Sequence, residues 1–219
     1  MKKIIFSLLT FLSITAFGAG NMFEITITNI TKNQIFAPPI VISHARDFHL
    51  FNLGEPSSAA LSLMAEDGDT SMIYEDAMAD GLVFDVTKAD GPVMPGQSVT
   101  LEIDVNYLTS NITVAGMLVN TNDGFFAIDG AAVKIRYFKS APQRNNALLA
   151  YVYDAGSEAN TESCDHIPGP PCGSGGVRVT DGAEGYVYPH AGLHGGGDLM
   201  VSEYGWAGPV AKVEYRRVQ

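Results

Sequence analysis

Apolar and polar residues alternate with a period of two over several short stretches of the chain. Phe23, Ile25 and Ile27 alternate with charged or hydroxyl-bearing residues, and residues 99–105 repeat the pattern. Such alternation buries one face of a strand and leaves the other in water. Further strand-like stretches are residues 40–42, 82–86, 112–119, 147–153 and 210–215. Many short strands separated by turn residues predict an antiparallel β-sandwich.

Two segments interrupt this pattern and predict short helices. The serine pair at 57–58 is suited to capping a helix, and the residues that would share its apolar face are Leu61, Met64 and Ala65. Thr70 or Ser71 would cap a second helix that runs through Met78. Each helix is about two turns long, too short to form a separate domain. The expected fold class is all-β, a sandwich of about eight strands with the two helices in a crossover.

Residues 1–20 have the features of an export signal. Lys2 and Lys3 precede a short apolar run, and small residues follow it. This order is typical of a Sec signal peptide, and the run is too short for a stable membrane span. We therefore expect residues 21–219 to form one exported domain, secreted, periplasmic or on the cell surface. No later stretch approaches the roughly 20 apolar residues of a membrane helix.

The charge balance narrows the possible partners. The chain has 13 basic and 24 acidic residues, a net charge of −11, and loss of the signal peptide would remove two of the lysines. Nucleic-acid-binding proteins usually carry a basic face, so that class is disfavoured. Binding to anionic lipid through a polybasic patch is disfavoured for the same reason. An acidic exported protein is better suited to binding divalent cations.

The spacing of the cysteines and histidines is weaker evidence for a disulfide and for a metal site. Cys164 and Cys172 lie eight positions apart, and in an oxidising compartment such a pair most simply forms a disulfide. His190, His194 and Asp198 are spaced four apart, as zinc ligands on a helix would be. The glycines between them argue against a helix, so we expect structural loop histidines. The acidic run at 66–69 is interpreted as a helix end, a turn and the next cap.

Seven phrases in the chain resemble the spondin N-terminal domain. They are HLF (49–51), AEDGDT (65–70), PGQS (95–98), MLVNTNDGF (117–125), YDAGSE (153–158), IPGPPC (167–172) and GLHG (192–195). The likeness extends in order from about residue 22 to residue 217 and is nearest to bacterial members that consist of this domain alone. It implies an antiparallel β-sandwich with a C2-like appearance and one calcium site in its loops. Animal members carry thrombospondin-type repeats after this domain, and this chain has none.

Three carboxylates are candidates for that calcium site. Asp123 follows one predicted strand, Asp154 ends another, and Glu158 comes after a turn in which Gly156 can take positive φ. Adjacent loops at one end of a sandwich could bring the three together, and a divalent ion would remove their mutual repulsion. By the resemblance, the calcium ligands of the family fall on these residues, with Glu158 in place of an Asp common in animal members. The alternative is that both Asp–Gly segments are merely turns.

Three functions remain open at this point. The first is a calcium-binding, non-catalytic binding or adhesion module for an extracellular protein or glycan. The second is a cation-dependent hydrolase of an extracellular polymer, with Asp154, Glu158 and His194 converging on a cleft. The third is a structural envelope protein whose ion only links loops. We favour the first and expect no enzymatic turnover, because the chain has no nucleophile elbow and no Gly-rich phosphate loop with its lysine.

Overall fold

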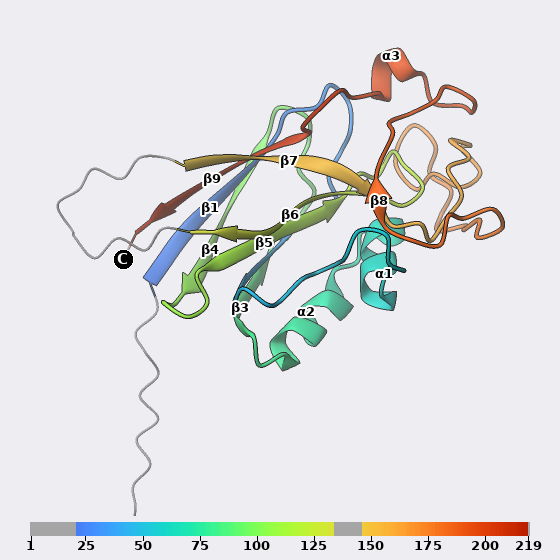
Figure 1. Cartoon of the computed structure of the whole chain (residues 1–219). Helices are drawn as coiled ribbons and strands as arrows, with labels where there is room; N and C mark the ends of the chain where they lie inside the picture. The colour runs from blue at the N-terminus through green and yellow to red at the C-terminus, as the bar shows by residue number, and fades with distance from the viewer. Residues whose placement is uncertain (1–20, 134–145, 219) are drawn as a thin grey trace, which may run out of the picture.

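The computed structural model describes residues 21–133 and 146–218, so the predicted signal peptide lies outside the described residues. Within them the chain forms nine strands and three helices (Figure 1). Their order is β1 (Asn21–Asn29), β2 (Ile40–His44), α1 (Ala59–Asp67), α2 (Ser71–Ala79), β3 (Val83–Lys88), β4 (Ser98–Val105), β5 (Asn111–Met117), β6 (Gly124–Ala132), β7 (Asn146–Asp154), β8 (Tyr188–Pro189), α3 (Val201–Tyr204) and β9 (Ala211–Arg217).

The strands form an antiparallel sheet that folds back on itself into two layers. Its order is β3-β2-β5-β6-β7-β9-β1-β4, with β8 paired to the end of β7. Strand β7 pairs with β6 on one side and with β9 on the other, so it belongs to both layers. The predicted all-β sandwich is confirmed, and α1 and α2 lie in the connection between β2 and β3 as expected.

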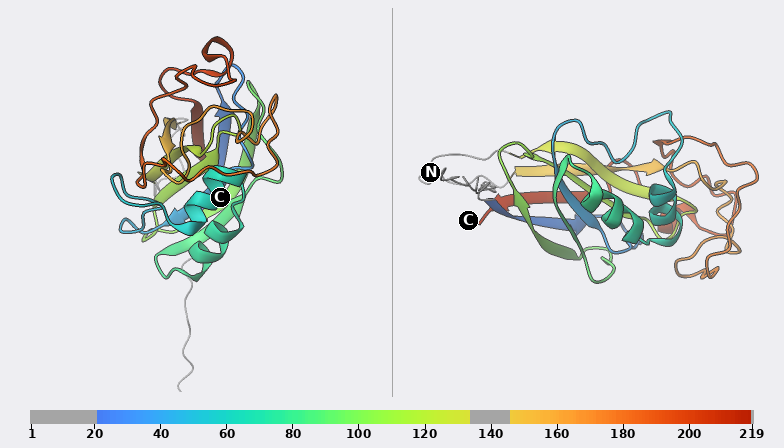
Figure 2. Two further views of the ribbon diagram at one scale, coloured as in Figure 1. Left: turned by 90° about the vertical axis from the view of Figure 1, so that its right-hand side faces the viewer. Right: turned by 90° about the horizontal axis from the view of Figure 1, so that it is seen from below.

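Two apolar clusters explain this layering. The alternating residues of β1 are buried between the layers, where Phe23, Ile25 and Ile27 meet residues such as Phe126 and Val213. A second cluster lies on the outer face of β2, β5 and β6, beneath the two helices (Figure 2). Helix α1 begins where the sequence predicts, because the Ser58 Oγ accepts a hydrogen bond from the Leu61 backbone N–H at 3.1 Å.

The acidic run at residues 66–69 spans the end of α1 and the turn to α2, as predicted. Helix α1 ends at Asp67, and Gly68 follows with φ 71°, the left-handed conformation that suits glycine at a helix end. The Asp69 carboxylate accepts the backbone N–H of Ser71 at 2.8 Å. The run therefore forms a helix end, a turn and the approach to α2.

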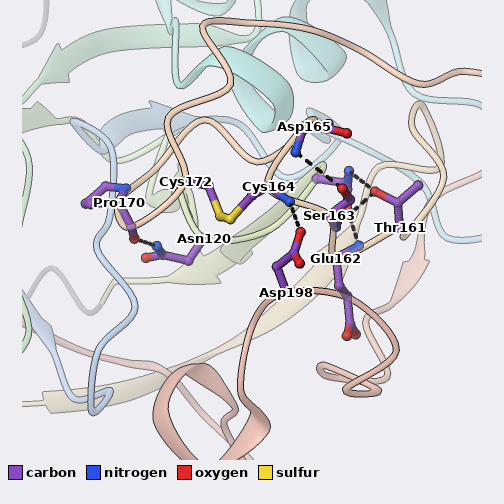
Figure 3. Close-up of a disulfide and its surroundings, with 10 residues drawn as sticks. Asn120, Thr161, Glu162, Ser163, Cys164, Asp165, Pro170, Cys172 and Asp198 are labelled. Carbon is purple, nitrogen blue, oxygen red and sulfur yellow. Dashed lines mark hydrogen bonds between the residues drawn. A yellow bond between two sulfur atoms is a disulfide. The ribbon is translucent and has the colours of Figure 1, made fainter.

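The long connection between β7 and β9 covers one end of the sandwich (Figure 1). It contains only β8 and α3, and it packs where β7 ends and β6 begins. The predicted disulfide is confirmed within it, since Cys164 and Cys172 are joined with a sulfur–sulfur distance of 1.96 Å (Figure 3). No helix in the described part of the chain is long and apolar enough to cross a membrane.

Candidate metal centre

The end of the β6–β7 pair brings the predicted carboxylates into one region. Gly124 pairs with Asp154 across the two strands, and the Ala155 N–H donates to the Asp123 carbonyl at 3.2 Å. Asp123 and Asp154 are fully buried, and Glu158 is 2% exposed. Three acidic residues from two neighbouring loops are therefore withdrawn from water together.

Asp123 is held by one of its two carboxylate oxygens. Its Oδ2 accepts the backbone N–H groups of Ser157 at 2.7 Å and Glu158 at 3.0 Å, and the Ser157 hydroxyl lies 3.2 Å away. Its Oδ1 is buried and has no hydrogen-bond partner. A buried acceptor without a partner costs about 1–3 kcal/mol, and more when it is charged. That oxygen is therefore suited to receiving a cation.

The turn between Asp154 and Glu158 depends on glycine. Gly156 has φ +65°, and a Cβ at this position would lie 2.3 Å from the carbonyl oxygen of Tyr186. Any larger residue would push the 184–188 segment away. This close approach sets the path of the loop that carries the N–H groups to Asp123.

Asp154 uses both carboxylate oxygens within the protein. Its Oδ1 accepts the Gly156 N–H at 2.8 Å. Its Oδ2 accepts the Asn160 side-chain amide at 2.6 Å and lies 3.0 Å from the Tyr188 hydroxyl. The sequence analysis identified neither residue. Tyr188 lies 34 positions along the chain from Asp154, and Asn160, six positions away, belongs to no recognisable motif.

Glu158 connects this region to helix α1. The carboxylates of Asp123 and Glu66 are near enough to repel its carboxyl group. Glu66 is itself 6% exposed and forms an ion pair with Arg178 at 2.7 Å. The acidic region thus extends beyond the three predicted residues.

Burial and like charge act in the same direction on these groups. Burial, followed by repulsion from Asp154, raises the pKa of Asp123 to about 7. Burial, followed by the charges of Glu66 and Asp123, raises the pKa of Glu158 to about 7. Burial also raises the pKa of Asp154, against hydrogen bonds that favour its charged form. The cluster therefore disfavours negative charge unless protons or a cation neutralise it.

His190 and His194 contact different carboxylates. The His190 side chain is 3% exposed, with its Nε2 3.9 Å from Asp154 Oδ2 and its ring edge-on to Trp206. Burial lowers the pKa of His190 to about 4, so this ring is neutral near neutral pH. His194 instead faces Glu162, with 3.4 Å between its Nδ1 and the carboxylate. The residue near Asp154 is thus His190, whereas the hydrolase alternative required His194.

Asp198 also has a structural partner in this loop. Its Oδ2 accepts the backbone N–H of Cys164 at 2.8 Å, beside the disulfide (Figure 3). His190, His194 and Asp198 lie in irregular chain, as the intervening glycines predict. They do not share one face of a helix and do not converge on one point.

The carboxylates are neighbours but do not form a finished cage. Among the residues that the structure describes, no group of three or more His, Cys, Asp or Glu side chains is arranged to hold a metal ion. Asp154 is turned toward Asn160 and Tyr188, whereas Asp123 has one oxygen free. Calcium tolerates irregular oxygen geometry, so these donors suit it better than an ion that requires a strict octahedron.

No known protein family matches the chain, and no curated protein is significantly similar to it.

Proposed function

We propose that the chain is an exported calcium-binding β-sandwich of the spondin type that acts as a non-catalytic binding or adhesion module. The observation that carries this proposal is the buried Asp123 Oδ1, which lacks a partner next to the buried Asp154 and Glu158. Asp123, Asp154 and Glu158 would hold the ion. Its contribution would be to neutralise their charge and to tie the 118–124 turn to the loop after β7.

Burial of the donors supports a binding module rather than an enzyme. A catalytic metal must keep one position open for water or substrate. Asp123 and Asp154 have no exposed surface and Glu158 has 2%, so protein oxygens would surround most of an ion there. The disulfide supports export, because such bonds persist mainly in oxidising compartments.

A thermal melt of metal-stripped protein comprising residues 21–219 tests the calcium site. Calcium at a hundredfold excess over its Kd should stabilise the fold by about 2.7 kcal/mol, which corresponds to several degrees in melting temperature. Magnesium should shift the melt much less, because it gives up its waters reluctantly. Asp123→Asn and Asp154→Asn should each remove most of the shift, and Glu158→Gln should weaken it.

Asp165→Asn is the matched control, since Asp165 is an exposed acid in the same long connection. It should respond to calcium like the wild type. An equal shift with magnesium, or a full calcium shift in Asp123→Asn, would show that the site assignment is wrong.

The partner is sought separately, with an array of glycans and matrix proteins probed with calcium and with chelator. A calcium-dependent ligand supports the binding module. Hydrolysis of an arrayed polymer that is lost in Asp154→Asn would instead support the hydrolase alternative.

A further inference from the structure

A row of five carboxylates continues from the proposed calcium site to the surface. In order it comprises Asp154, Asp123, Glu158, Glu66 and Asp67, and we call it the carboxylate row. Asp123 feels the charge of Asp154, and Glu158 feels the charges of Asp123 and Glu66. The first four are between 0% and 6% exposed, so water screens them poorly.

Among the residues that the structure describes, one positively charged side chain forms ion pairs with this row. Nη1 of Arg178 lies 2.7 Å from Glu66 Oε2, and its Nη2 contacts Asp67. The guanidinium is a permanent cation that bridges two carboxylates, and its contact with Glu66 is an ion pair without hydrogen-bond geometry. Arg178 is also close enough to Glu158 to favour the charged form of that carboxyl group.

The backbone around Arg178 is tied to the segments that carry these acids. The Ala159 N–H donates to the Val179 carbonyl at 2.9 Å, which ties the arginine segment to the loop of Glu158. Gly176 lies along Asp67, with 3.8 Å between its ideal Cβ position and Asp67 Oδ1. The arginine therefore bridges the end of α1 and the loop that carries the predicted ligand.

The charges of the row indicate how the Arg178 ion pairs affect metal binding. The four buried carboxylates carry four negative charges when ionised, and a divalent ion together with Arg178 supplies three positive ones. Without the guanidinium, Glu66 and Glu158 would form an uncompensated buried pair that attracts a cation. The Arg178 guanidinium lies beside Glu66, where that cation would bind.

We propose that the Arg178 guanidinium is a fixed cation on the carboxylate row, that it takes the place of a second metal ion, and that it weakens the affinity of the row for calcium. This inference rests on the proposed calcium site. Arg178 is then a specificity-determining residue, because it limits both how many ions bind and how tightly.

Calcium titration of metal-stripped protein by calorimetry tests the proposal. Arg178→Gln should bind calcium about fivefold more tightly or take up a second equivalent, because a repelling charge has been removed. Arg178→Lys keeps the charge and should stay within about twofold of the wild type. Arg216→Gln is the control, since Arg216 pairs with Glu24 on the β1–β9 face. It should leave the titration unchanged.

A substitution that removes a negative charge from the row distinguishes an electrostatic effect of Arg178 from a loss of structure. Glu66→Gln removes one negative charge of the row and should weaken calcium binding about fivefold. The double variant Glu66→Gln/Arg178→Gln removes the ion pair as a unit and should return near the wild-type affinity. If Arg178→Gln alone does not fold, the proposal is tested by comparing the calcium affinity of Glu66→Gln with that of the double variant.

The failures of the two proposals are distinguishable. If the wild type binds calcium and folded Arg178→Gln binds it equally or more weakly, the calcium site stands and the role of Arg178 is overturned. If the double variant binds no better than Glu66→Gln, the role of Arg178 is likewise overturned. If the wild type binds no calcium, both proposals are overturned.

Discussion

Individual hydrogen bonds determine how the Asp154 carboxylate is presented. Tyr188 and Asn160 both contact its Oδ2, and Tyr188 also lies 3.0 Å from Glu184. Such contacts orient ligands without touching the ion, and their loss typically lowers metal affinity about 10- to 100-fold. These two residues are therefore positioning residues of the proposed site.

Tyr188→Phe should lower calcium affinity about tenfold while the fold is retained. The physical reason is that Asp154 loses a hydroxyl contact that restrains its Oδ2. Calcium titration measures the effect, and Tyr186→Phe, in the adjacent ring 5.7 Å away, is the matched control. Equal affinity in the wild type and Tyr188→Phe would show that Asp154 is positioned without the hydroxyl.

His44 provides a pH-dependent contribution to stability away from the carboxylates. Its ring lies 2.9 Å from the Thr113 hydroxyl and 2.8 Å from the Ala45 carbonyl, and burial lowers its pKa below 6.5. The unfolded chain therefore binds this proton more readily than the folded one. The contribution of His44 is present above about pH 6.5 and is lost as the pH falls toward its folded pKa.

His44→Gln should consequently destabilise the protein more at pH 8 than at pH 5. Urea unfolding of the wild type and the variant at both pH values measures this, because titrating groups that do not interact with His44 cancel in the difference. His194→Gln is the control, since the His194 side chain is 61% exposed in the connection between β7 and β9. A cost of His44→Gln that is constant with pH would refute the assigned shift.

At the scale of elements, a backbone cradle fastens the 191–200 loop to the site region. Glu162 is 4% exposed and takes φ 52°, a conformation that strains a non-glycine residue by about 1 kcal/mol or more. Its carboxylate accepts the backbone N–H groups of His194, Gly195 and Gly196. The Glu162 N–H in turn bonds to Asn122, next to Asp123.

Glu162→Gln should loosen this loop at a cost of about 1–3 kcal/mol, because the acceptor loses its charge and one of its two oxygens becomes an NH2 donor that faces backbone N–H groups. Amide hydrogen exchange at Gly195 and Gly196 should accelerate selectively. Asp181→Asn, an exposed acid in the same connection, should leave both amides unaffected. Unchanged protection in Glu162→Gln would mean that the loop is held by other contacts.

The elements also show what local sequence pattern can and cannot reveal. β1 and β4 were predictable because one face of each alternates, and Ser58 marks α1 as a local cap. β6 was missed because its first residues are buried on both faces and show no alternation. β8 and α3 have only two and four residues, too few for a periodic signal.

The candidate site likewise contains residues that the sequence predicts and residues that it does not. Asp123, Asp154 and Glu158 could be predicted from the sequence, because each lies at a strand end or in a turn that the local sequence indicates. Tyr188 and Arg178 could not be predicted, because only the folded loops bring them to Asp154 and to α1. The Arg178–Asp67 contact spans 111 residues of chain, and no pattern along the sequence encodes such a distance.

At the scale of the whole molecule, side chains join the two ends of the sheet. Strand β4 is the last in one layer and β3 the last in the other. The Asp85 Oδ2 accepts the Asp104 N–H at 2.8 Å, and the Ser43 hydroxyl donates to the Asp104 carbonyl at 2.6 Å. These bonds replace strand pairing and cap an edge that would otherwise be open.

Asp85→Ala should therefore destabilise the whole domain by about 1–3 kcal/mol, because the Asp104 N–H loses its acceptor. Asp85→Asn keeps an acceptor oxygen and should cost clearly less. Chemical unfolding gives the free energies, and hydrogen exchange at the Asp104 amide reports whether the β3–β4 junction opens. If both variants unfold like the wild type and the Asp104 amide stays protected, apolar packing between the layers suffices to close the sandwich.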